Sequence, residues 1–150
     1  MQCVGSAVTD PAGKHPYASR LELSIRWSVF VRFVVGTSGE NHRWLTGVIA
    51  EARLLRDDDA LERYEVEWLE ETYAWLNAHL PCPPFRESDW SRDAVCWFKD
   101  NAGESITRVW GIVALLREHG LQVRVLRSRN PGKILYEDDY QVVVEEWRSL

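Results

Sequence analysis

Three prolines in the range 81–84 set the firmest limit on how this chain can fold. They follow a segment, 57–79, whose apolar residues recur at helical spacing. Proline lacks a backbone N–H donor and restricts the residue before it, so a helix cannot continue through this cluster. The sequence therefore predicts a helix over 57–79. We expect the three aspartates of 57–59 to open it, because carboxylates cap the first amides of a helix and favour its positive end.

The apolar side chains of this predicted helix form two ridges. At 100° per residue, the centres of the two ridges lie about 130° apart. One ridge must pack on the core, and the other is available to a second element or to a partner. The first ridge contains Leu61, Tyr64, Trp68 and Trp75, and the second contains Val66, Leu69, Tyr73, Leu76 and Leu80.

In several other segments, apolar residues alternate with polar ones or form a short uninterrupted run, and both patterns are typical of strands. The predicted strands are 21–35, 44–50, 94–98, 121–125, 134–136 and 140–145. Together with the helix over 57–79 and a second helix over 102–119, this order predicts one α+β domain over 21–150. Its sheet is expected to be mixed or mainly antiparallel, with about five strands and two helices packed on one face.

The second predicted helix has clear boundaries. Asn101 and Glu104 match a capping box, and Gly120 stands where a left-handed C-cap residue belongs. Apolar residues cover most of its surface, so we expect this helix, including Trp110, to form the centre of the core.

Residues 1–20 differ from the rest of the chain because they contain two prolines, small residues and no apolar period. This composition predicts a disordered tail or a non-native extension, with a natural start near Val29 as one explanation. We therefore assign no chemistry to this segment.

The chain is acidic, with a net charge of −5, and rich in tryptophan, with eight residues of that type. The acids are concentrated after residue 56: the segment 57–71 alone holds eight acids and one arginine. An acidic body repels phosphate, so nucleic acid is not the expected partner, and a basic protein surface is favoured. The longest apolar run, 27–35, is too short to span a bilayer, so no membrane partner is expected.

Three cysteines, Cys3, Cys82 and Cys96, lack the spacing of metal ligands, and no nucleotide-binding loop or hydrolase elbow motif occurs. No metal and no cofactor are therefore expected. Free thiols suit a reducing compartment, so the sequence predicts a cytoplasmic protein.

Three strings carry a resemblance: LNAHLPCPPF, DAVCWFKDNAGE and NPGKILYEDDYQVVVEEW. They resemble a family of small bacterial proteins of unknown function, over roughly residues 29–147. The resemblance implies no activity, so any function has to be inferred from the residues themselves.

The predicted function is protein–protein interaction by a small acidic protein, of the inhibitor, antitoxin or regulatory-subunit type. Trp and Tyr dominate binding hot spots, and acids around them suit a basic partner. The candidate binding residues are Tyr64, Trp68 and Trp75, with Glu67, Glu70 and Glu71 on the neighbouring face. The same ring pattern is also typical of a helix packed in the core.

The alternative is a small hydrolase-like or nuclease-like enzyme that uses the carboxylates of residues 89–104. Such chemistry requires two or more carboxylates to converge on one point, with a base or a nucleophile nearby. The candidate groups are Asp89, Asp93, Asp100 and Glu104, with His79 or Cys96. The absence of a catalytic motif favours the interaction protein over the enzyme.

Overall fold

A computed structural model describes residues 28–36 and 46–147 of the chain. The tail predicted for residues 1–20 and the first part of the strand predicted over 21–35 lie outside these ranges. The described part therefore begins just before the first strand and ends just after the last one.

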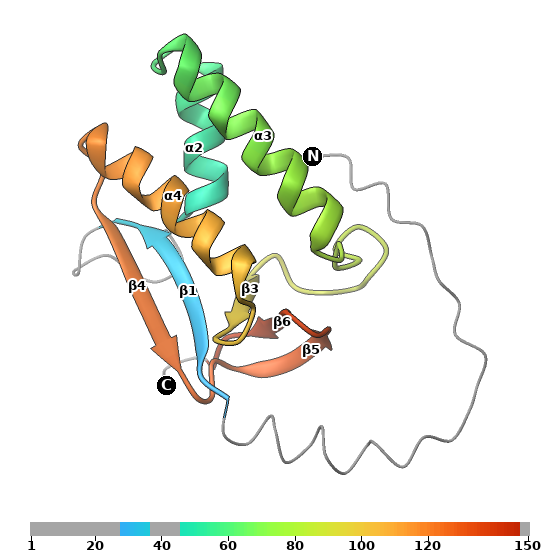
Figure 1. Ribbon diagram of the computed structural model, residues 1–150. Helices are drawn as coiled ribbons and strands as arrows, with labels where there is room; N and C mark the ends of the chain where they lie inside the picture. The colour runs from blue at the N-terminus through green and yellow to red at the C-terminus, as the bar shows by residue number, and fades with distance from the viewer. Residues whose placement is uncertain (1–27, 37–45, 148–150) are drawn as a thin grey trace.

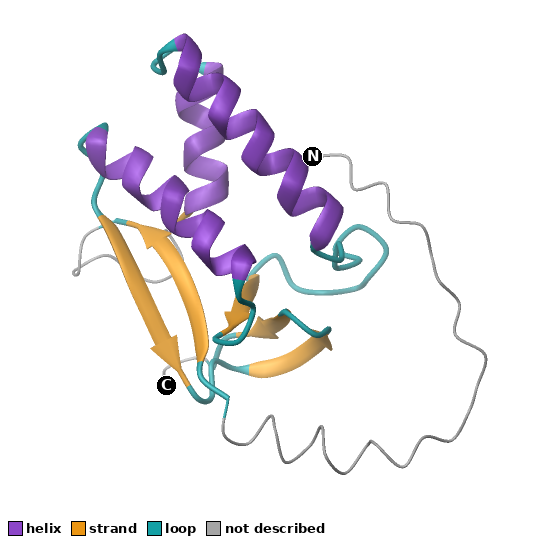
Figure 2. Cartoon of the chain, viewed as in Figure 1, coloured by secondary structure: helices purple, strands orange, loops and turns teal. Residues whose placement is uncertain are grey.

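The described residues form three helices and six strands, and the helices lie together on one face of the sheet (Figures 1 and 2). The helices are α2 (Val48–Asp57), α3 (Arg63–His79) and α4 (Glu104–Glu118). The strands are β1 (Phe30–Val35), β2 (Thr46–Gly47), β3 (Ala94–Lys99), β4 (Val123–Ser128), β5 (Lys133–Glu137) and β6 (Gln141–Glu145). Each strand pair is antiparallel, which confirms the predicted α+β class.

Strand β1 organises the sheet because it is paired on both edges. β4 runs along one edge for the whole length of β1. β2 and β3 share the other edge, since Phe30 pairs with β3 near one end and Val34 with β2 near the other. Between them, Arg32 and Phe33 have no registered strand partner on that edge among the described residues. The sheet then continues from β3 to β6 and β5.

The strand predicted over 44–50 is wrong for most of its length. Only Thr46–Gly47 is extended in the described residues, and α2 begins at Val48. The segment that follows places Val48, Ile49, Ala52 and Leu55 on one side of a helix, and Val48 and Ala52 are buried. This helix is the third one on the sheet, where the sequence predicted two.

The aspartates of 57–59 end a helix instead of opening one. Asp57 is the last residue of α2, and Asp59 takes a positive φ of 54°. Helix α3 begins at Arg63, after a capping box in which the backbone N–H of Glu62 donates to Oε2 of Glu65 at 2.8 Å. Glutamates thus perform the capping role that the sequence analysis gave to the aspartates. The predicted end of this helix at His79 is confirmed.

Helix α4 lies at the centre of the core, as predicted. Val109, Ile112, Val113 and Leu116 are fully buried against β1, α2 and α3. The predicted capping box is absent, because the N-cap residue is Gly103, with a φ of 56° and no side-chain cap. At the other end Gly120 has a φ of 81°, which confirms the left-handed C-cap.

Trp110 differs from the expectation for this helix. Its side chain remains 38% exposed and packs edge-on against Phe33, with ring centroids 5.1 Å apart. Trp110 therefore lies at the border of the core, on a flank of α4 that the sheet only partly covers.

The opposite face of the sheet carries a second, smaller cluster of Phe30, Trp97, Val142 and Val144. Arg32 is on the same side of β1 as Phe30, because side chains alternate along a strand. Its Nη1 donates to Oε1 of Glu146 at 2.9 Å, and the side chain is almost entirely buried.

Glu65 and His119 connect the start of α3 to the end of α4. Nε2 of His119 lies 3.0 and 3.1 Å from the two carboxylate oxygens of Glu65, which is itself buried. The hydrogen bonds from the Glu62 backbone and from His119 hold the pKa of Glu65 below its ordinary value.

We predict that Leu116→Ala destabilises the fold by about 2–5 kcal/mol, because a fully buried leucine leaves a cavity. Trp110→Ala should lower the free energy of unfolding by less than Leu116→Ala does, because part of the Trp110 ring already contacts solvent. Urea denaturation of both variants measures the difference, and a larger loss for Trp110→Ala would contradict this description of the core.

The lowered pKa of Glu65 predicts a dependence of stability on pH. A carboxyl whose folded pKa is depressed contributes stability above its unfolded pKa, and this contribution is lost as pH falls through the folded value. Glu65→Gln should therefore melt below the parent at pH 7, and the difference should shrink below pH 4.5, the ordinary value for the group. A difference that stays constant from pH 7 to pH 3 would contradict the ionic role of Glu65.

Candidate functional site

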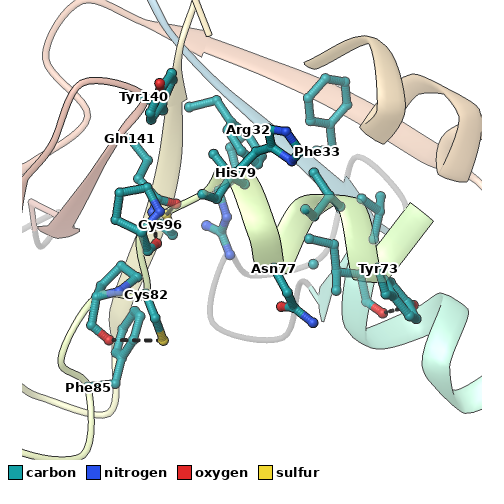
Figure 3. Close-up of a pocket in the computed structure, with 18 of the residues that line it drawn as sticks. Arg32, Phe33, Tyr73, Asn77, His79, Cys82, Phe85, Cys96, Tyr140 and Gln141 are labelled. Carbon is teal, nitrogen blue, oxygen red and sulfur yellow. Dashed lines mark hydrogen bonds between the residues drawn. The ribbon is translucent and has the colours of Figure 1, made fainter. Parts of the chain in front are cut away.

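The connection from α3 to β3 includes residues 81–93, which we call the proline segment. A cavity of about 1060 Å³ lies between the second half of α3, the proline segment and the sheet (Figure 3). It is located where β2 and β3 separate along β1, so that Arg32 and Phe33 form part of its wall. Helix α4 packs on the sheet over β1 and β4, and the side of the sheet near β3 and β6 faces the cavity. The split edge of β1 thus creates the space.

The cavity wall is mainly apolar. Phe33 and Phe98 come from the sheet, Leu76 and Leu80 from the end of α3, and Phe85 from the proline segment. The prolines that end the helix therefore also form one side of the site. Trp90, further along the same segment, lies between Phe85 and Tyr136 of β5, at ring distances of 5.4 and 6.2 Å. These ring contacts fix the segment against the sheet.

Gln141 is the polar residue that joins the walls of the cavity. Its Nε2 donates to the carbonyl oxygen of Pro81 at 2.6 Å and to Oδ2 of Asp138 at 3.1 Å. Its Oε1 accepts the thiol of Cys96 at 3.2 Å. Gln141 is 5% exposed, so these bonds satisfy an amide that would otherwise be costly to bury.

The Cys96 thiol and the Tyr73 hydroxyl in the cavity wall remain neutral at pH 7. Burial raises the pKa of the Cys96 thiol to about 12, and the nearby Asp138 carboxylate acts in the same direction. Burial also raises the pKa of Tyr73 to about 12, and its hydroxyl donates to the carbonyl oxygen of Ile49 at 2.8 Å. A nucleophilic cysteine needs a lowered pKa, so the environment of Cys96 opposes thiolate chemistry.

The structure brings together two of the six residues named for an enzyme. His79 and Cys96 both line the cavity, whereas Asp89, Asp93, Asp100 and Glu104 do not. The His79 ring stacks on Trp75 at 4.0 Å, and its Nδ1 lies 2.8 Å from the Trp75 carbonyl oxygen. Glu104 forms an ion pair with Arg108. Within the described ranges, no three His, Cys, Asp or Glu side chains gather in a way that could hold a metal.

The residues named for partner binding lie along α3 and at its junction with α4. Tyr64 is 71% exposed and Trp68 is 38% exposed. The Trp68 ring packs on Gly111 of α4 so closely that a Cβ atom there would lie 2.7 Å from its Cζ2. Trp75 is half-buried between the His79 ring and the Arg108 guanidinium, which lies 4.4 Å from the indole centre. The other ridge, represented by Leu69 and Leu76, faces the core.

The three glutamates of the predicted surface are exposed on the same helix. Glu67 accepts a hydrogen bond from Arg63 at 3.0 Å, and Glu70 and Glu71 are exposed without an ion pair among the described residues. We define the acidic α3 surface as Tyr64, Glu67, Trp68, Glu70 and Glu71.

Two features of the site differ from the sequence analysis or were not predicted. Cys96 is a free thiol, but Cys82 is disulfide-bonded, so the expectation of free thiols fails at Cys82. The cavity itself was missed. Its one local signal in the sequence is Gln141, a polar residue directly before three valines, whereas the prolines by themselves indicate only the end of a helix.

No protein-family model, curated protein or solved structure matches the chain. None of the helices in the described ranges combines the length and the hydropathy needed to cross a membrane.

We predict that Cys96 reacts with iodoacetamide about a thousandfold more slowly at pH 8 than an ordinary thiol. A rise of three units in pKa lowers the thiolate fraction by that factor. Mass spectrometry of the peptide that contains Cys96 measures the rate, and unfolding in urea should restore ordinary reactivity. Fast labelling of the folded protein would contradict the buried, neutral thiol.

Proposed function

We propose that this protein acts by protein–protein interaction, as an inhibitor, antitoxin or regulatory subunit, through the acidic α3 surface. The observation that carries the proposal is the exposure of Tyr64, at 71%, beside the partly exposed ring of Trp68. Large rings that remain exposed in the free protein can bury their surface in a partner, and Tyr and Trp are enriched among binding hot spots.

The charge around these rings favours a basic partner. Glu67, Glu70 and Glu71 are exposed on α3, and Asp58 and Asp59 are exposed in the turn that precedes it. Acids on one surface attract Lys and Arg on another and accelerate encounter, most strongly at low salt.

The α3 surface is also held rigidly. Trp68 is fixed against Gly111, and the Glu65–His119 contact fixes the start of α3 to the end of α4. A rigid surface loses little conformational entropy on binding, which supports its use as a preformed binding face.

The cytoplasm remains the proposed location. The free thiol of Cys96 is compatible with it, whereas the disulfide at Cys82 is more typical of an oxidising compartment.

The test uses photocrosslinking followed by binding kinetics. Benzoylphenylalanine in place of Tyr64 should capture a basic protein in native cells, whereas the same group in place of Ile134, 39% exposed on β5, should not. Equal capture at the two positions would overturn the proposal.

With the captured partner, we expect the glutamates of the acidic α3 surface to control the association rate and Tyr64 to control the dissociation rate. Replacing Glu67, Glu70 and Glu71 by glutamine should slow association and reduce its salt dependence, because screening acts on exposed charges. Tyr64→Ala should speed dissociation about tenfold or more, since a desolvated anchor is lost after encounter. Trp68 is left intact in this test because it also packs on α4, and Ile134→Ala serves as the control. Unchanged rates in both variants would contradict the assignment of this surface.

A further inference from the structure

We infer that the cavity beneath the second half of α3 binds a small amphiphile with a single long apolar chain, whose polar end remains at the opening. This site is separate from the acidic α3 surface, which lies on the first half of the helix. It therefore does not depend on the proposed interaction function.

The size and lining of the cavity suit such a ligand. Small-molecule sites typically enclose about 300–1,000 Å³ and are lined by apolar and aromatic side chains, with a few polar groups. This cavity measures about 1060 Å³, and Phe33, Leu76 and Phe98 contribute apolar wall from both the sheet and α3. In Figure 3 Phe85 of the proline segment and Tyr73 of α3 lie on different sides of the cavity lining.

Most of the polar side chains in the wall are already engaged within the protein. Gln141 binds Pro81, Asp138 and Cys96, and Tyr73 donates to Ile49. No carboxylate occurs among the described lining residues, and the permanent charge there, on Arg32, is paired with Glu146. The inner wall thus offers no unpaired charge to a ligand, so affinity has to come from burial of apolar surface.

Some polar residues of the cavity wall are exposed to solvent. Asn77 is exposed on α3, and Tyr140 is 38% exposed in the bend just before β6. A polar end group placed there keeps its hydration while the chain is buried, which avoids the cost of burying an unpaired polar group.

The first experiment measures the affinity of the full chain for 1-octanol, 1-decanol and 1-dodecanol by calorimetry. Each buried methylene contributes about 0.8 kcal/mol, so Kd should fall about fourfold per carbon. Decanoate and decylammonium should bind within about tenfold of decanol, because their end groups stay in solvent. A Kd that changes less than twofold across the alcohols, or a preference above tenfold for either ion, would overturn the inference.

Two variants test whether the ligand binds in this cavity or elsewhere on the surface. Gly47 lines the cavity with an ordinary φ of −69°, and a Cβ atom there would meet no atom of the described residues within 4 Å. Gly47→Leu should therefore occupy cavity space without backbone strain and weaken decanol binding at least tenfold. The matched control is Ala114→Leu, at an exposed position of α4 outside the cavity, which should bind within twofold of the parent. Equal affinities for the two variants would overturn the site.

Cys96 supplies a readout that needs no substitution. It is a free thiol in the cavity wall, so saturating decanol should slow its alkylation at pH 9 in the parent protein. The rate is read by mass spectrometry of the peptide that contains Cys96. An unchanged rate at saturation would show that the chain does not enter this cavity.

Discussion

The architecture depends on how the two edges of β1 are paired. One edge is covered by β4 throughout, whereas in the described part of the chain β3 and β2 pair with the two ends of the other edge. Because β3 turns away from β1 after two registered pairs, the sheet opens at Arg32 and Phe33. Helix α4 fills the face over β1, and the second half of α3 faces the opening across the cavity. The candidate binding site is thus a consequence of strand pairing.

The chemistry of this opening favours binding over reaction. Gln141 fixes the proline segment to β6 and holds the Cys96 thiol, while burial raises the pKa of that thiol to about 12. The carboxylates named for an enzyme lie outside the cavity lining. A site whose polar groups bind each other offers shape and apolar surface to a ligand, but no activated nucleophile.

Helix α3 presents different chemistry along its length. Its first half carries the exposed ring of Tyr64 among glutamates, and its second half lines the cavity with Leu76 and Leu80. Its inner ridge packs on the core through Leu69, Tyr73 and Leu76, and the Glu65–His119 contact fixes its start. One rigid helix therefore supports both proposed surfaces, each independent of the other in its residues.

Local patterns in the sequence determined the elements whose causes are local. The prolines fixed the end of α3, apolar periodicity placed α4 at the core, and Gly120 marked the end of that helix. The aspartates of 57–59 were placed at the wrong helix end, because a carboxylate is compatible with either side of a turn until the neighbouring helices are known.

Only the tertiary structure decided which ridge of α3 is buried and how far Trp68 and Trp110 are exposed, since these depend on the crossing of α3 and α4. The cavity also depends on the tertiary structure. It requires β1, β3, β6 and the proline segment to meet, and contacts between residues as distant as Pro81 and Gln141 leave no periodic signal in the chain.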